Sequence, residues 1–352
     1  MARDDASEAA ATLSASPAAR ESIFRRNFRH FLADNLLVNI GMGIIGASTV
    51  VPDLVRHLTG SQVLIGLAGN LGVIGQTLPQ LLIARQVASA HRKKWWFVGP
   101  NIPGRLTILL LALLMAIWGA DRPERVLWAF FVLYGLRALT DGLAGLAWAD
   151  LAGTSLDNRW RARVFGLTTA ITSVALLALA PAIAAVLGAK ALPFPRNYVM
   201  LFGVAGALLA GAILPVAFVC ELPAPMPAES RPPVSVSLPA LVGLLRTDRP
   251  LRAFSGVRVL WILFAMASPF YVGYATGALG LSSAVAVSTM VATQTAGSIA
   301  GALAYTWLGA RSNLIVMRLA LASAALLPFG ALLASRLGPA PLYVGLTVSG
   351  LA

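Results

Sequence analysis

Long apolar runs separated by short polar or charged turns dominate the chain from about residue 30 onward. A helix of roughly 20 apolar residues covers a hydrocarbon core of about 30 Å, and most of these runs reach that length. Lipid offers no hydrogen-bond partners to an open backbone, so helices are the expected spans. The pattern predicts complete spans at 31–54, 62–84, 95–118, 125–148, 164–187, 198–220, 254–278, 282–308 and 313–335.

The spacing of the runs predicts two halves joined by a linker. Six runs precede a proline-rich polar stretch that begins at Glu221, and three complete runs follow it. A tenth run begins near Pro341 but reaches Ala352 before it is long enough to cross a bilayer, so we expect a truncated second half. The predicted organisation is a cytoplasmic tail at 1–30, a six-helix half at 31–220, a cytoplasmic linker at 221–250 and an incomplete half at 251–352.

Composition supports an integral membrane protein. Hydrophobic residues make up 58% of the chain and charged residues 12%, about half the charged fraction of soluble domains. The net charge of +13 could suggest a nucleic-acid partner, but the basic residues gather in short clusters beside apolar runs, which is the pattern of membrane topology. Most of these clusters fall on the side of the N-terminus. We therefore predict a multi-pass plasma-membrane protein with a cytoplasmic N-terminus and no nucleic-acid partner.

Two basic loops have distinctive sequences. The turn between the second and third predicted spans is basic, and the next span contains a further arginine. The loop between the fourth and fifth spans opens on an aspartate and continues into an arginine-rich helix start and a glycine. The residues concerned are Arg92, Lys93, Lys94 and Arg105 in the first case, and Asp150, Arg159, Arg161, Arg163 and Gly166 in the second.

These loops resemble the two cytoplasmic motifs of the major facilitator superfamily, although the acidic residue and glycine that usually open the first motif are absent here. The likeness extends from about residue 30 to the end of the chain. It implies an all-α membrane bundle with six spans in one half and about four of a second six-span half. It also implies a monomeric carrier that moves a small solute by alternating access, coupled to an ion or to protons. The loop motifs would form charge networks that latch the inward-closed state.

Charged residues inside predicted spans are candidate functional groups, because a charge in hydrocarbon costs about 2.5 kcal/mol or more. Arg137 and Asp141 lie near the middle of the fourth span, four residues apart and therefore on one helix face. One interpretation is an internal ion pair that lowers the cost of insertion and packs against a neighbouring helix. The other is a pair that lines a central cavity, where Arg137 attracts an anionic or zwitterionic solute.

Asp34 is a second candidate, one turn into the first predicted span. It is either a proton-coupling carboxylate or a helix-start residue near the headgroups, and Arg105 either pairs with it or extends the basic loop. Uncharged polar residues inside the spans can bind neighbouring helices or line a cavity. Those singled out as substrate or coupling candidates are Asn39, Asn70, Gln76 and Gln294.

Enzymatic and ATP-driven functions find little support in the sequence. The three histidines lie far apart, so no metal site or cofactor is expected, and no phosphate-binding loop of the ATPase type occurs. A membrane-embedded transferase would need clustered carboxylates, for which Asp150 and Asp157 are the nearest match. Two alternatives to a carrier stay open: a permease subunit of an ATP-driven transporter and a non-transporting remnant.

Overall fold

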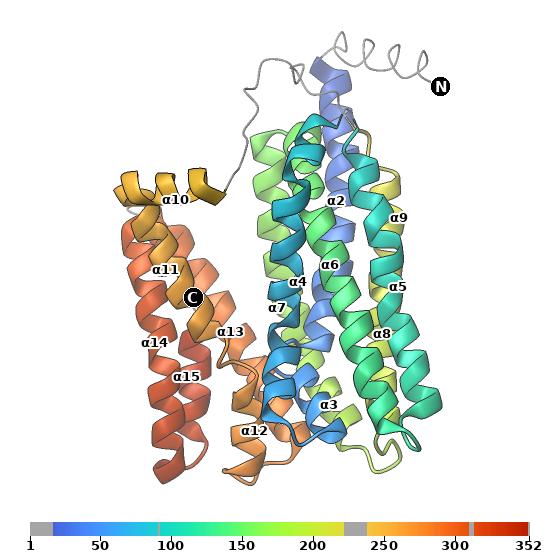
Figure 1. Cartoon of the computed structure of the whole chain (residues 1–352), viewed down its shortest axis with the longest axis vertical. Helices are drawn as coiled ribbons and strands as arrows, with labels where there is room; N and C mark the ends of the chain where they lie inside the picture. Colours follow the sequence, from blue (N-terminus) through green and yellow to red (C-terminus); the bar gives the residue numbers. More distant parts are fainter. Residues whose placement is uncertain (1–16, 91, 222–237, 310–312, 351–352) are drawn as a thin grey trace.

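The computed structural model describes residues 17–90, 92–221, 238–309 and 313–350, which form helices joined by short connections (Figure 1). The helices follow the predicted order of apolar runs. They are α2 (Pro17–Ile45), α3 (Val50–Leu58), α4 (Gln62–Ser89), α5 (Lys94–Trp118), α6 (Pro123–Ser155), α7 (Asn158–Gly188), α8 (Arg196–Gly211), α9 (Ile213–Ala217), α10 (Leu238–Thr247), α11 (Arg249–Ala265), α12 (Phe270–Gly277), α13 (Ser283–Gly309), α14 (Asn313–Leu337) and α15 (Ala340–Gly350).

Six helical segments of the described chain are long and apolar enough to cross a membrane, or seven if the bent pair α2–α3 counts as one span. The helices α4 and α13 are also long, with 28 and 27 residues, but they are rich in glycine, alanine and polar residues. In Figure 1 they run beside the more apolar helices. The all-helical membrane fold predicted from the sequence is therefore confirmed.

The first span is broken rather than continuous. Helix α2 begins at Pro17, well before the predicted start near residue 31, and ends at Ile45. Gly46 then adopts a positive φ of 52°, a conformation that glycine reaches without the steric cost of a side chain. After this residue α3 starts at Val50, and the two helices are bent by 41° relative to each other.

Small residues allow the helices of the first half to approach closely. A Cβ atom placed on Gly142 of α6 would lie 2.4 Å from the backbone oxygen of Gln76 on α4. A Cβ atom on Gly104 of α5 would lie only 1.9 Å from the Thr140 hydroxyl on α6. Glycines at such positions let membrane helices gain packing contacts that larger residues would prevent. They fix α4, α5 and α6 as one tightly packed unit.

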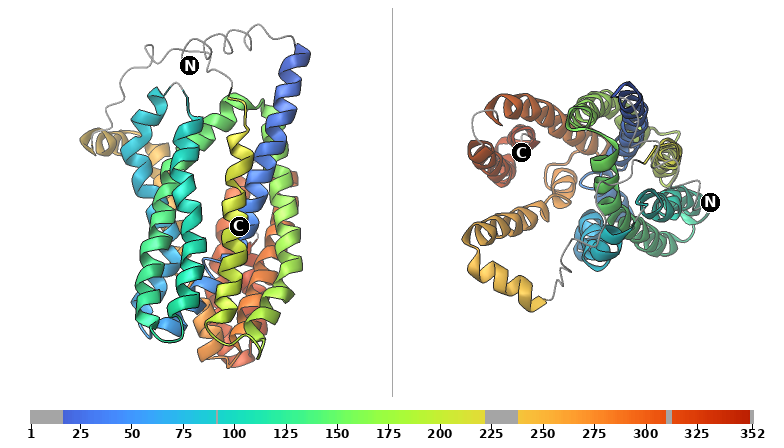
Figure 2. Two further views of the ribbon diagram at one scale, coloured as in Figure 1. Left: turned by 90° about the vertical axis from the view of Figure 1, so that its right-hand side faces the viewer. Right: turned by 90° about the horizontal axis from the view of Figure 1, so that it is seen from above.

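The helices form two groups. Viewed from above in Figure 2, α2 to α9 lie together, and α10 to α15 lie beside them, with α13 next to α7. We call the end of the bundle that holds the start of α2 the N-terminal face. The predicted linker at 221–250 lies partly outside the described residues, but its later part contains the helix α10.

Two hydrophobic clusters divide the core along the bundle axis. One includes Leu54 of α3 and also Val272 and Val287 of α12 and α13, so it joins the two helix groups. The other lies toward the N-terminal face and includes Phe31, Phe97, Ala147, Trp160 and Val216, all from α2 to α9. In Figure 1, α4 and α11 approach each other near α12 and diverge toward the N-terminal face.

Candidate functional site

Asp34 and Arg105 form a buried ion pair between α2 and α5. One Arg105 guanidinium nitrogen lies 2.8 Å from an Asp34 carboxylate oxygen, and the exposed fractions of the two residues are only 5% and 2%. Because α2 begins at Pro17, Asp34 lies well inside the helix. Asp34 is therefore not a helix-start residue, and of the two alternatives for Arg105 the structure shows pairing with Asp34.

Arg137 and Asp141 form a second ion pair within α6. Arg137 is buried, whereas the Asp141 side chain keeps an exposed fraction of 20%. The Arg137 guanidinium also lies 5.8 Å from the centre of the Tyr134 ring, within reach of a cation–π interaction. The Arg137 charge is therefore buried in the protein interior, while the Asp141 carboxylate stays partly exposed.

We refer to Asp34, Arg105, Arg137 and Asp141 as the central charge cluster. The two pairs are close enough for Asp141 to act electrostatically on Asp34. Within the part of the chain that the structure describes, several buried polar atoms of this region have no hydrogen-bond partner. They are one terminal nitrogen of Arg105, Nε of Arg137 and the hydroxyl of Tyr134.

Unpartnered buried donors are costly, since leaving such a group unsatisfied costs about 1–3 kcal/mol and more for a charged one. Donors of this kind bind an acceptor group strongly when one reaches them. A solute with a carboxylate, phosphate or carbonyl oxygen would satisfy the guanidinium donors of the central charge cluster. The central charge cluster therefore combines two carboxylates with guanidinium donors that lack partners among the described residues.

The uncharged candidates divide by location. Asn39 is exposed and donates to the Asn35 carbonyl of its own helix at 2.7 Å. Asn70 donates to the Gly66 carbonyl at 2.9 Å and also lies 3.5 Å from the Met266 carbonyl, across the two helix groups. Gln76 is exposed, and its backbone packs against Gly142. Gln294 is half-buried on α13, where its backbone packs against Gly350 of α15.

At the N-terminal face, two residues of the predicted loop motifs come together. Lys93 donates to the Asp150 carboxylate at 2.5 Å, which joins the start of α5 to α6. Lys94 instead donates through its ammonium group to the Val219 carbonyl at 3.0 Å. The loop network thus includes the segment after α9, which the motif resemblance alone does not indicate.

Glu221 completes this network. Its two carboxylate oxygens accept the backbone N–H groups of Lys93 and Lys94 at 2.7 and 3.2 Å. These are groups at the N-terminus of α5, where unpaired N–H groups and the helix dipole favour a negative charge. Asn27 of α2 also exchanges hydrogen bonds with the Cys220 backbone at 2.8 and 2.9 Å. From the sequence, Glu221 was expected only to begin a linker.

The remaining members of the basic loops point outward. Arg159 and Arg163 are exposed, and the Arg163 guanidinium lies 5.0 Å from the centre of the Trp160 ring. Arg161 bonds to the side chain of Asn158 in the same turn. Gly166 and Arg92 are both exposed, and Arg92 also interacts with other residues. The contacts described for the loop motifs lie within the first helix group.

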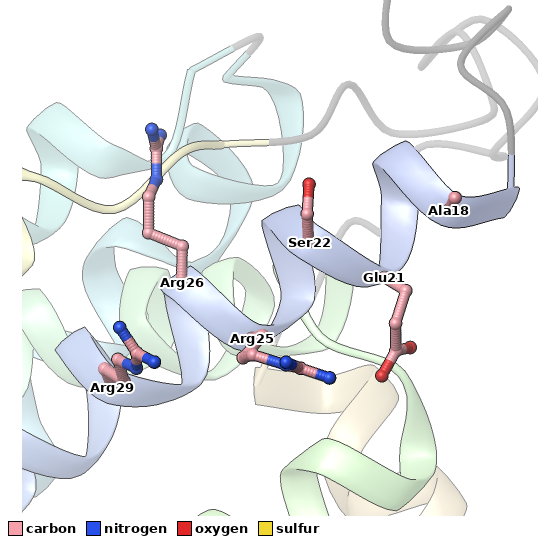
Figure 3. Close-up of a pocket in the computed structure, with 6 residues that line it drawn as sticks. All are labelled: Ala18, Glu21, Ser22, Arg25, Arg26 and Arg29. Atoms are coloured by element: carbon pink, nitrogen blue, oxygen red, sulfur yellow. The ribbon is translucent and has the colours of Figure 1, made fainter.

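A hollow of about 530 Å³ lies along the first turns of α2 (Figure 3). Its lining residues all come from that helix, and they are Ala18, Glu21, Ser22, Arg25, Arg26 and Arg29. In Figure 3 the Glu21 and Arg25 side chains extend to the same side of the helix, while Arg26 extends to the other. This hollow lies at the N-terminal face, away from the central charge cluster.

A third polar group lies at the opposite end of the bundle and was missed in the sequence. Asp53 of α3 is fully buried, and its carboxylate accepts the Tyr198 hydroxyl at 2.7 Å and the Ser283 hydroxyl at 3.0 Å. Nearby, Arg56 donates to the Thr276 hydroxyl at 3.1 Å. We call these five residues the opposite-end cluster.

The opposite-end cluster joins the two helix groups, because α3 and α8 belong to the first group and α12 and α13 to the second. The signal in the sequence was an aspartate beside a proline at a predicted span end, which reads as an ordinary boundary residue. Its partners lie 145 and 230 residues away. Residue spacing within one span gives no indication of such contacts.

Comparison with known proteins identifies solved structures of similar fold. No protein-family model matches the chain, and no curated protein sequence matches it. Among solved structures, the nucleoside transporter NupG aligns with a TM-score of 0.61 and 16% identity over 92% of this chain and 79% of that one. A mutant of NupG aligns with a TM-score of 0.63 and 15% identity over 93% of this chain and 79% of that one. The chain therefore has the fold of these transporters, and the major-facilitator-like architecture predicted from its sequence is confirmed.

Proposed function

We propose that the protein is a secondary active transporter that carries a small solute by alternating access. The observation that carries this proposal is the position of the contacts between the helix groups. The opposite-end cluster and the shared core bind the groups at one end, while the core near the N-terminal face belongs to α2–α9. In alternating access, the two halves of a carrier rock against each other and close one end of the protein at a time. Contacts between the helix groups at a single end fit such a closed end.

The central charge cluster is the proposed solute site. It lies on spanning helices, and beside its two ion pairs one terminal nitrogen of Arg105 and Nε of Arg137 lack hydrogen-bond partners among the described residues. Intramembrane charges that pair with one another commonly mark a substrate or ion pathway. Arg137 would bind an anionic or hydrogen-bond-accepting group, and Asp34 and Asp141 would carry the coupling proton or cation.

Orientation follows from the basic residues. Arg25, Arg26 and Arg29 on α2 lie at the N-terminal face, as do Lys93 and Lys94 at the start of α5. An excess of basic residues marks the cytoplasmic side. In this proposal the N-terminal face is therefore cytoplasmic, the protein is a plasma-membrane monomer, and the structure represents the state whose closed end is the opposite one.

Uptake into proteoliposomes tests the proposal. We expect the full chain to accumulate at least one member of a panel of nucleosides, amino acids and small carboxylates when a proton or sodium gradient is imposed. The nucleosides are included because the transporters of similar fold carry that name. Accumulation should disappear when an ionophore dissipates the gradient, since coupling to the gradient is the only energy source in this scheme. Correctly folded, reconstituted protein that accumulates no member of the panel under either gradient would count against the proposal.

A further inference from the structure

Helix α10 stands apart from the bundle. In Figure 1 it lies across the direction of the spanning helices, next to the start of α11 and toward the N-terminal face. Every residue from Val242 to Pro250 is exposed. The exposed fractions of Val242, Leu244 and Leu245 are 41%, 51% and 36%. Apolar side chains of this helix are therefore left uncovered by the described protein.

An uncovered helix of this length needs a partner. A helix of 10 residues is marginal in water, because isolated helices shorter than about 12–15 residues gain too little to offset nucleation. Its later part is one-sided, because Val242, Leu244 and Leu245 fall within one half of the helix circumference. Gly243 and Thr247 fall on the other side of the helix. The pattern is that of a helix at a boundary between apolar and polar surroundings.

The orientation of α10 is fixed by its junction with α11. Arg252 donates to the carbonyl groups of Leu245 and Arg246 at 3.4 and 2.9 Å, which satisfies acceptors at the end of α10. Asp248 caps α11 by accepting the Leu251 N–H group at 2.9 Å. These contacts hold the end of α10 against the start of α11, so the two helices meet in one fixed corner.

The corner also sets the depth of α10 in a membrane. The spanning segment Arg249–Gly277 begins immediately after it, and only 6% of its most apolar stretch is buried inside the protein. The start of α11 therefore enters lipid, and α10 lies at the level of the headgroups. Arg246, Arg249 and Arg252 gather there, with Asp248 as the nearby acid. Each basic residue near an anionic membrane surface contributes about 1 kcal/mol of attraction.

We propose that α10 is an in-plane anchor that binds the headgroup boundary of an anionic membrane. Val242 and Leu245 face the acyl chains, and the arginines of the corner bind lipid phosphates. We expect its apolar face to be buried about 5–10 Å into the boundary between headgroups and acyl chains, as for other amphipathic interfacial helices. The anchor would fix the entry of the second helix group in the bilayer. It rests on the membrane location alone and does not depend on transport.

Site-specific fluorescence tests this anchor. The native cysteine is replaced by Cys220→Ser in the full chain, and Leu245→Cys is compared with the matched control Thr247→Cys, two residues along the same helix. Each variant is labelled with a polarity-sensitive fluorophore in vesicles that contain phosphatidylglycerol. We expect a nitroxide attached high on the lipid acyl chain to quench the label at position 245 several-fold more than the label at 247. Aqueous iodide should show the reverse order.

Three outcomes would overturn the inference. Equal quenching of both labels by iodide would show that α10 lies in water. Protection of the label at 245 from both quenchers would show that protein, and not lipid, covers the helix. Equal lipid quenching in vesicles of phosphatidylcholine alone would remove the role of anionic lipid. Because the fluorescence is read without a transported solute, these outcomes are independent of whether the protein proves to be a carrier.

Discussion

Replacing Arg137 with glutamine is expected to abolish or strongly reduce solute uptake while the protein stays folded. The substitution removes the buried guanidinium of the central charge cluster and its pairing with Asp141. Hydrogen bonds to charged groups contribute about 1.5–3 kcal/mol, so the affinity for an acceptor-bearing solute should fall by roughly tenfold to a hundredfold. Initial uptake rates over a range of solute concentrations measure the effect.

The matched control is Arg125→Gln on the same helix. Arg125 is exposed and lies 5.8 Å from the centre of the Trp118 ring, far along α6 from the central charge cluster. We expect this variant to transport as the parent does. If Arg137→Gln also retains the parent's affinity and rate, the Arg137–Asp141 pair is an internal neutralising pair, and the first of the two interpretations of these residues holds.

Replacing Arg105 with alanine is expected to lower the free energy of unfolding by about 3–5 kcal/mol, which is the usual cost of leaving one partner of a buried ion pair uncompensated. Asp34 would remain as a buried carboxylate without its 2.8 Å partner. Thermal unfolding in detergent, followed by the fluorescence of a thiol-reactive dye or by circular dichroism, gives the ranking of the variants.

The double variant Asp34→Leu with Arg105→Met gives the matched comparison. Apolar residues of similar volume often replace a buried ion pair at little cost, so the double variant should recover most of the stability lost in Arg105→Ala. If the double variant instead loses as much as the two single changes added together, Asp34 and Arg105 are not energetically coupled. Transport by a stable double variant would further show that Asp34 is not needed for coupling.

Much of the fold follows from the sequence because apolar run length is set by bilayer thickness. The runs predicted the order of the helices, and the four-residue spacing predicted that Arg137 and Asp141 pair. The start of the first helix was placed too late, because residues 17–30 are too polar to be counted within a hydrophobic run although they continue the helix. That error made Asp34 look shallow.

Contacts between distant segments could not be predicted in the same way. The pairing of Asp34 with Arg105 was one of two alternatives, since residue spacing gives no distance between separate helices. The opposite-end cluster was missed because Asp53 meets Tyr198 and Ser283 only after three helices assemble. The resemblance of the loops to family motifs identified Lys93 and Asp150, but the position of Glu221 at the N-terminus of α5 depends on the path of the chain after α9.

A reversible disulfide between the helix groups tests alternating access most directly. A Cβ atom on Gly188 of α7 would lie 3.3 Å from the Ala284 Cβ on α13, close to the separation of about 3.5–4.5 Å in disulfides. The measurement is solute uptake by the Gly188→Cys, Ala284→Cys variant in a Cys220→Ser background, before and after oxidation, with each single cysteine as control. We expect oxidation to stop uptake in the double variant alone and a reductant to restore it. Complete cross-linking with undiminished uptake would show that the helix groups do not separate at this end during transport.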